Sequence, residues 1–283
     1  MRLVATMLLW LVTTLLLAVA VPAMWAQRNV VSEDGYAAFS ASAAEDPQLQ
    51  SAMAAELASQ IISFAADNGY TLDREMVRRG TVAYTGSAGF PGQFGQANRI
   101  AHRWMFTDSV QREAGTDRWF IDIAPMLNDP SIGALLGEID LDVPQTLTVP
   151  ITVPETTGLH PGRLRQVSTW GPWITVGTTI LTGVFALLTL AASRSRGKAL
   201  AALGVSALLV GAAGWAGLEV ARGYVNDALN RTTGDIRVIA DVVVGHAEDS
   251  LHRWFNLTLA AGAALVVFGV LVALLGGLRR RDA

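Results

Sequence analysis

Four long apolar stretches constrain the fold of this 283-residue chain more than any other feature of its sequence. The first runs from Leu3 to about Trp25, and the others cover residues 170–193, 199–218 and 255–278. No Asp, Glu, Lys, Arg or His lies within these stretches. Each is close to the ~20 residues that a helix needs to cross the hydrocarbon core of a bilayer. Because a chain in lipid must satisfy its own backbone, these stretches predict four transmembrane helices.

The first stretch, within residues 1–26, allows two interpretations. Arg2 and the cleavage-like Val21-Pro22-Ala23 would suit a secretory signal peptide. The apolar core of a signal peptide usually has roughly 7–15 residues, however, and this one is longer. We therefore favour an uncleaved first transmembrane helix, with a cleaved signal peptide as the alternative.

Arginine and lysine suggest an orientation for the four helices. Arg2 precedes the first stretch, cations at residues 194–198 separate the second from the third, and residues 279–281 follow the fourth. The positive-inside rule then places both termini, including the tail at 279–283, in the cytoplasm of a multi-pass plasma-membrane protein. The segments at 27–169 and 219–254 would be extracytoplasmic. Several tryptophans map near that outer interface, where indole rings prefer to lie: Trp25, Trp170, Trp173, Trp215 and Trp254.

The extracytoplasmic domain at residues 27–169 has a mainly helical pattern. Asp46-Pro47 is typical of a helix start. Asn68-Gly69 would end that helix, Asp73 would cap a second, and Pro91-Gly92 would lead into a third. The first of these helices carries apolar residues at helical spacing: Leu49, Met53, Leu57, Ile61 and Phe64.

Two segments of the same domain have strand patterns instead. Residues 119–123 are mostly apolar, and residues 146–149 and 151–153 alternate polar and apolar side chains. Pro150 and Pro154 restrict the second segment to an edge strand. The expected fold class is therefore a mainly α membrane protein with four transmembrane helices and a helical (α+β) outer domain that contains a small β-ribbon.

The last two transmembrane helices are expected to extend outward as a hairpin at residues 219–254. Residues 232–235 suit a turn, and apolar residues from Ile236 to Trp254 recur at spacings of three and four. A helix from Asp235 to Leu278 would be about 66 Å long, roughly twice the hydrocarbon thickness. Its apolar face outside lipid must pack on a partner, and we expect that partner to be the outer domain.

Small residues on the third stretch predict a helix-packing seam. They recur at spacings of three and four, which places them on one helical face: Gly204, Ala207, Gly211 and Gly214. Small side chains let membrane helices approach closely. The seam could form within the chain or between copies of it.

Short motifs of the outer domain resemble a known family. They are Asp46-Pro47-Gln48-Leu49, the segment at residues 94–106 with Asn98-Arg99 and His102-Arg103, and the segment at residues 120–127. Together they resemble uncharacterised integral membrane proteins from actinobacteria, in which one membrane span precedes this domain and three follow. The resemblance covers most of the chain and implies a cell-envelope protein, but it implies no particular activity.

No motif commits the chain to a chemistry. There is no cysteine, the four histidines lack the spacing of a helical zinc site, and neither a Gly-x-Ser-x-Gly elbow nor a phosphate cradle is present. We therefore expect no catalytic residue, no metal and no cofactor. The formal net charge of −3 gives no basic footprint for nucleic acid.

The most distinctive polar group is Asn98, His102 and Arg103 on the third outer helix. Asn98 lies one turn before His102, on the same face. The group could contact a ligand, such as an anionic headgroup, or a partner carboxylate. The interpretation we favour is structural, with His102 tying one helix to another through a hydrogen bond.

Three functions follow as hypotheses. The leading one is a non-enzymatic scaffold, assembly factor or accessory subunit of the cell envelope, whose outer domain binds a protein partner or a second copy. The alternative is a sensor or carrier for membrane lipid or a small ligand, which predicts an apolar cleft between the hairpin and the outer helices. The third is an oligomeric channel or transporter with a threonine-lined path along Thr178, Thr179, Thr182 and Thr189. An enzyme ranks last.

Overall fold

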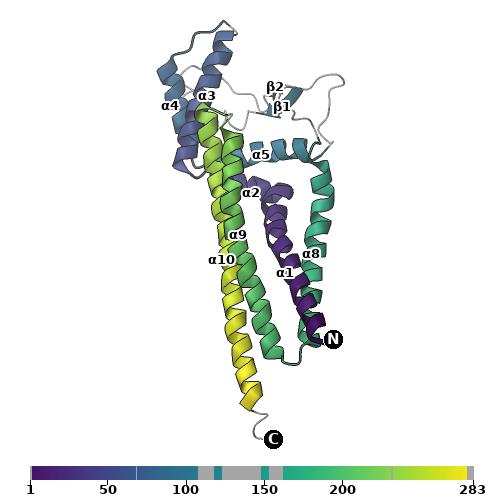
Figure 1. Cartoon of the computed structure of the whole chain (residues 1–283). Coiled ribbons are helices and arrows are strands. Elements are labelled where there is room, and N and C mark those ends of the chain that lie inside the picture. The colour runs from purple at the N-terminus through teal and green to yellow at the C-terminus, as the bar shows by residue number, and fades with distance from the viewer. Residues whose placement is uncertain are drawn as a thin grey trace. The chain divides into compact units, whose positions relative to one another are not determined.

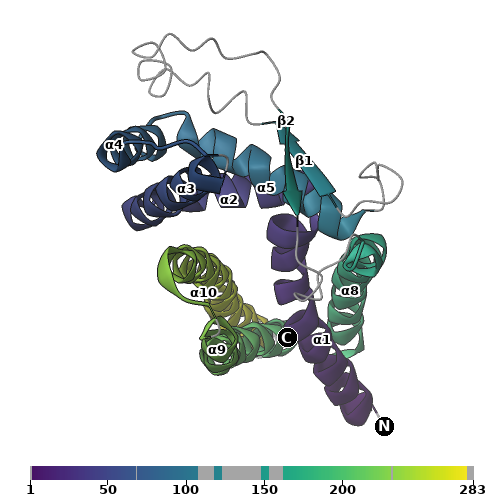
Figure 2. The ribbon, with the colours of Figure 1, turned by 90° about the horizontal axis from the view of Figure 1, so that it is seen from above.

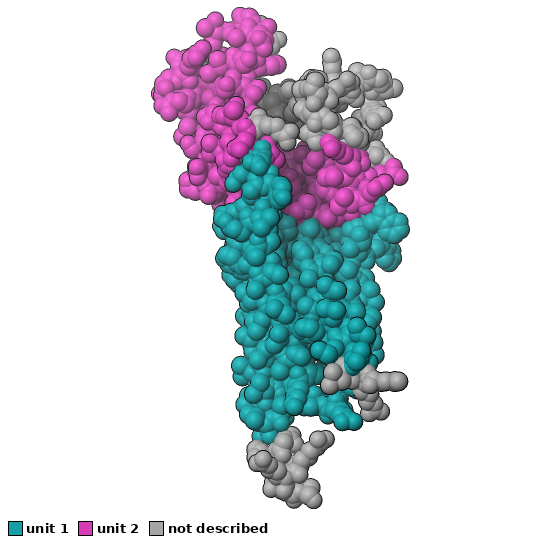
Figure 3. Space-filling model, viewed as in Figure 1, with its two compact units in different colours: residues 1–28, 169–227, 247–283 teal, residues 29–168, 228–246 magenta. Residues whose placement is uncertain are grey.

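The computed structural model describes residues 2–67, 69–107, 118–122, 148–152, 162–230 and 232–278. The chain divides into two compact units, which are coloured separately in Figure 3. Unit 1 comprises Met1–Arg28, Thr169–Asp227 and Ala247–Ala283, and unit 2 comprises Asn29–Ser168 and Ala228–His246. The first segment of unit 2 has nearly the same sequence bounds as the outer domain predicted at residues 27–169.

Long helices make up unit 1, and α9 and α10 also contribute to unit 2. The helices are α1 (Arg2–Ala26), α8 (Arg165–Ala192), α9 (Arg196–Leu229) and α10 (Gly234–Leu278). The prediction of a multi-pass membrane protein is confirmed, because four helices are long and apolar enough to cross a membrane. In both ribbon views α1 lies beside α8, and α9 lies beside α10 (Figure 1, Figure 2).

Both hairpin helices continue beyond the apolar stretches that define the spans. Helix α9 extends past residue 218 to Leu229, and α10 begins at Gly234, where φ is +67°. Only a short connection separates the two helices, so most of residues 219–254 are helical. The resulting α10 has 45 residues, and its part up to His246 belongs to unit 2.

Unit 2 contains four further helices, of which α3 and α4 begin at the predicted caps. A π-helical turn, η1 (Gln27–Val31), precedes α2 (Glu33–Ala43), α3 (Pro47–Asp67), α4 (Arg74–Thr85) and α5 (Phe90–Phe106). The Asp46 carboxylate accepts a hydrogen bond from the Gln48 N–H at 2.7 Å, and the Asp73 carboxylate accepts one from the Glu75 N–H at 2.8 Å. These bonds satisfy backbone donors that the first helical turn leaves unpaired.

The core of unit 2 joins its helices to the start of α10. The buried members of this core are Ala43, Ala44, Leu49, Tyr84 and Phe90. Three residues of α10 pack against it: Ile239, Val242 and Val243. The prediction that the extended last helix packs on the domain between the first two spans is therefore confirmed.

The predicted fold class is wrong in its β component. Helices make up most of the described residues, and the core that the described residues of unit 2 form comes from helices and the α2–α3 connection. Segments β1 (Arg118–Asp122) and β2 (Thr148–Thr152) are only an isolated antiparallel pair, with Phe120 opposite Pro150. Two such short strands are not independently stable, and proline cannot donate to the ladder. The alternating pattern therefore does not create a β-containing domain, and the fold is helical.

Candidate functional site

His102 ties α5 to the π-helical turn η1. Its Nε2 lies 3.0 Å from the backbone carbonyl oxygen of Val30, and the residue is only 3% exposed. Its ring stacks on Phe106, with ring centroids 4.1 Å apart, and lies 5.3 Å from the ring of Tyr36. The last carbonyls of a helical segment lack donors within that segment, and His102 supplies one. Since a carbonyl only accepts, the proton lies on Nε2.

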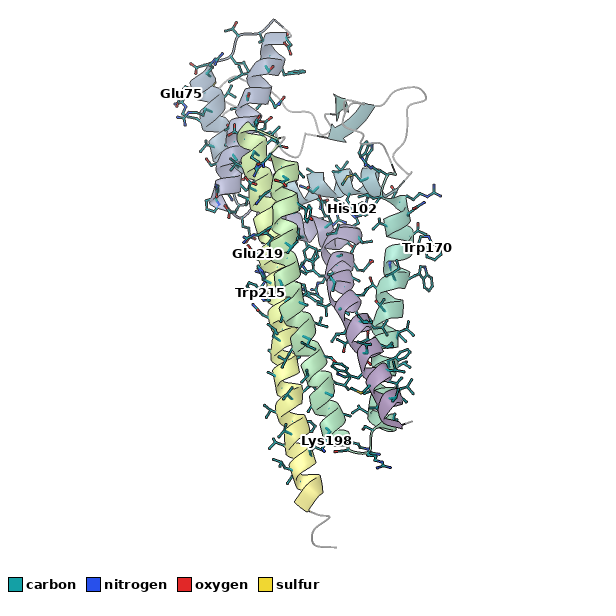
Figure 4. The ribbon with its side chains drawn as sticks, viewed as in Figure 1. Glu75, His102, Trp170, Lys198, Trp215 and Glu219 are labelled. Atoms are coloured by element: carbon teal, nitrogen blue, oxygen red, sulfur yellow. The ribbon has the colours of Figure 1, made fainter. Side chains whose placement is uncertain are left out.

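The other ring nitrogen of His102 has a different environment. Nδ1 is buried and has no hydrogen-bond partner among the described residues. In the neutral ring with its proton on Nε2, this atom is an acceptor without a donor. The buried position of the ring, labelled in Figure 4, favours the structural interpretation over contact with a ligand.

Arg103 and Arg99 hold the first turn of α2. The Arg103 Nε donates to the Glu33 carboxylate at 2.8 Å, and Arg99 donates to Glu33 at 3.3 Å and also to Asp34. The hydrogen bond from Arg103 is the largest cause that lowers the pKa of the Glu33 carboxyl below its ordinary value. Carboxylates at a helix N-terminus also interact favourably with the helix dipole.

The predicted group of Asn98, His102 and Arg103 is therefore engaged within unit 2. Asn98 donates to the Phe94 carbonyl of its own helix at 2.9 Å. Sequence reasoning identified these residues but missed Glu33 and Asp34 as their neighbours. Both acids follow a helix cap, Ser32, but no local pattern indicates which distant arginines they would meet.

Exposed apolar side chains occur where α3 ends and α4 begins. This surface, the α3–α4 apolar end, consists of Ile61, Phe64, Tyr70, Leu72 and Met76. Phe64 is 67% exposed and Tyr70 is 70% exposed. Sequence reasoning assigned Ile61 and Phe64 to the same face as the buried Leu49, but the core of unit 2 ends before it reaches them. Large contiguous apolar patches on protein surfaces often mark interaction sites.

The small residues of α9 face α10 within unit 1. A methyl group at Gly204 would lie 2.6 Å from the backbone nitrogen of Val266 and 2.7 Å from the Gly262 carbonyl oxygen. One at Gly211 would lie 2.6 Å from the Leu259 Cγ. Ala207 is buried, and Gly214 abuts the ring of Phe255. The structure thus places the predicted seam within the chain.

The seam also uses glycines that sequence reasoning did not select. Gly197 meets the backbone of Ala273, and Gly269 meets the backbone of Ala201. With Gly204, Gly211 and Gly262, these residues recur every seven positions on each helix, which is the period of a left-handed helix pair. This seven-residue recurrence of glycine in the sequence could have identified the additional seam residues.

The threonines of α8 engage their own backbone. Thr178, Thr179, Thr182 and Thr189 each donate to a carbonyl one turn earlier, at 2.7 Å. Their hydroxyl protons are therefore not offered to a permeating ion or solute, which weakens the channel hypothesis. The packing of Ile239, Val242 and Val243 of α10 on the core likewise provides a solid contact in unit 2 where the ligand-carrier hypothesis predicted a cleft.

Among the described residues, no group of three or more His, Cys, Asp or Glu could hold a metal ion. No family model matches the chain, and neither a curated protein nor a solved structure matches it. The surfaces and cavities of the chain itself are therefore the basis for its functional assignment.

The seam makes a prediction about Gly204. Gly204→Ala should destabilise the α9–α10 pair by about 1–3 kcal/mol, because its methyl group would overlap the backbone of α10. The matched control is Gly217→Ala on the same helix, where a methyl group meets no described atom within 4 Å. Midpoints of heat-induced aggregation in detergent would compare the variants. Equal midpoints for Gly204→Ala and Gly217→Ala would contradict the role of the seam.

The carboxylate of Glu33 predicts a pH dependence for unit 2. Its folded-state pKa lies below the ordinary value of 4.5, so its stabilisation is present above that pH and is lost as pH falls through the folded-state pKa. Glu33→Gln should cost roughly 1 kcal/mol at neutral pH, because the pair is partly exposed and screened. The difference from the native chain should vanish in acid.

Hydrogen exchange of α2 and α5 at pH 7 and at pH 3 measures this effect in the full chain. Glu56→Gln is the control, since Glu56 accepts a hydrogen bond from Gln60 on its own helix. A Glu33→Gln effect that persists undiminished at low pH would refute the charge-based explanation.

Proposed function

We propose that this chain is a non-enzymatic membrane protein that acts as a scaffold, assembly factor or accessory subunit of the cell envelope. Unit 2 docks a protein partner through the α3–α4 apolar end. The observation that carries the proposal is the exposure of Phe64 and Tyr70 on a unit that already has its own packed core. The core of unit 2 consists of other residues, and most of the surface of the Tyr70 ring is exposed, which supports an intermolecular contact at this end.

The charges around the apolar end favour a protein partner over a membrane surface. Asp67, Asp73, Arg74 and Arg79 are exposed near it, so both signs of charge are present. An apolar centre with a mixed polar rim is typical of protein interfaces. A surface that binds anionic lipid would instead carry an excess of lysine and arginine.

The distribution of charge and tryptophan supports an extracytoplasmic location for unit 2. The α8–α9 turn contains Arg194, Arg196 and Lys198. Figure 4 places Trp170 and Trp215 far from Lys198 along the helices of unit 1. With the cationic turn in the cytoplasm, both termini are cytoplasmic and the tryptophans lie at the outer interface. The actinobacterial resemblance agrees with a cell envelope location and remains a prediction.

Site-specific crosslinking tests the docking surface in cells that express the full chain. A photoreactive amino acid at Leu72 should give a distinct protein adduct, and one at Val82, which is exposed on α4 outside the apolar end, should not. Phe64→Ser with Tyr70→Ser should abolish the Leu72 adduct while unit 2 keeps its protease resistance. Equal adducts at both positions, or adducts only to lipid or to a second copy, would contradict the proposal.

Cysteine labelling tests the orientation, because the chain has no cysteine of its own. A membrane-impermeant maleimide applied to intact cells should label Thr71→Cys in unit 2. It should label Ser195→Cys in the α8–α9 turn only after the membrane is permeabilised. The reverse pattern would place unit 2 in the cytoplasm.

A further inference from the structure

A cavity of about 720 Å³ lies in unit 1 beside the α8–α9 turn. Helix α1, the end of α8 and the start of α9 all contribute to it, and its lining includes Met7, Trp10, Ser193, Arg194 and Lys198. Figure 4 labels Lys198 at this end of α9. The volume falls in the range of roughly 300–1,000 Å³ that small-molecule sites occupy.

Within the described part of the chain, no acidic group pairs with the cations of this cavity. Arg194 and Lys198 are exposed, and neither forms an ion pair within the described part of the chain. No Asp or Glu occurs between Glu155 and Glu219, and none precedes Glu33. The helices that line the cavity therefore present only positive charge at this end, which favours an anion.

The wall of the cavity is mostly apolar, and three of its neutral donors form hydrogen bonds within the protein. The Trp10 Nε1 donates to the Ala202 carbonyl oxygen at 2.8 Å, which holds the indole against α9. The Thr189 hydroxyl donates to the Phe185 carbonyl, and the Ser193 hydroxyl donates to the Leu190 carbonyl. The ligand that suits this cavity thus has an anionic group for the two cations and an apolar body for Met7 and Trp10.

We propose that this cavity binds one anionic phospholipid, with its phosphate between Arg194 and Lys198 and its first acyl carbons against Met7 and Trp10. Basic pockets between the ends of transmembrane helices lie at the level of lipid headgroups, where such contacts form. A free phosphate ion would satisfy the two cations and leave the apolar wall uncovered. This site is separate from the α3–α4 apolar end, and its failure would leave the docking proposal intact.

Native mass spectrometry of the full chain, released from nanodiscs, tests the site. Discs that contain phosphatidylglycerol should yield protein with one retained lipid, and discs of phosphatidylcholine with the same acyl chains should not. Each cation near an anionic headgroup contributes about fivefold in affinity, so Arg194→Gln with Lys198→Gln should weaken retention roughly 25-fold. Both leaflets of the disc contain the lipid, so the result does not depend on orientation.

The matched control is Arg196→Gln, which removes a charge from the same turn but does not line the cavity. It should leave retention unchanged, and an equal loss would mean diffuse attraction and would overturn the proposal. Equal retention of phosphatidylcholine would also overturn it. Complete displacement of phosphatidylglycerol by millimolar inorganic phosphate would show a phosphate site instead of a lipid site.

A second variant tests the apolar wall without changing the charge. Ala192→Leu adds volume to the lining of the cavity and should reduce retention of phosphatidylglycerol severalfold. If the double charge variant fails to fold, Lys198→Gln alone against Arg196→Gln decides the electrostatic part. Unchanged retention in both Ala192→Leu and Lys198→Gln would refute the site.

Discussion

The close approach of α9 and α10 is the interaction on which the organisation of the chain depends most. Between helices in lipid there is no hydrophobic drive, because lipid tails are as apolar as leucine, so packing and hydrogen bonds must hold the pair together. Gly204 and Gly262 lie against each other's helix with no side chain between the backbones. The seven-residue recurrence of glycine continues this contact along both helices, and it explains how two long apolar helices stay paired.

Helix α10 then carries a second role, which its length makes possible. The part of α10 up to His246 belongs to unit 2, where Ile239, Val242 and Val243 complete the core. The rest of α10 belongs to unit 1 and pairs with α9. One continuous helix therefore supplies apolar surface to both units. Loss of regular helix within α10 would remove a wall from the core of unit 2, although that core is built mainly from residues far away in sequence.

The features that could be predicted from the sequence are those that depend on residues close together in the chain. Apolar length predicts the four spans, and Asp46 and Asp73 predict the starts of α3 and α4, because a cap is a contact between near neighbours. The errors concern long-range packing. Helical spacing cannot tell that the core reaches Leu49 but stops before Phe64, and alternation cannot tell whether a strand finds a sheet to join. The pairing of Glu33 with Arg103 depends on how α2 and α5 meet, which neither segment encodes alone.

Several polar groups of the described residues serve the packing of the helices. His102, Arg99, Arg103 and the threonines of α8 are engaged in holding helices or in bonds to their own backbone. Among the described residues, two features carry our binding proposals: the exposed α3–α4 apolar end, and the cavity beside Arg194 and Lys198. Both offer shape, apolar area or charge, which are the means of holding another molecule in place. A protein that binds a partner through one surface and a lipid through another would keep that partner at the membrane.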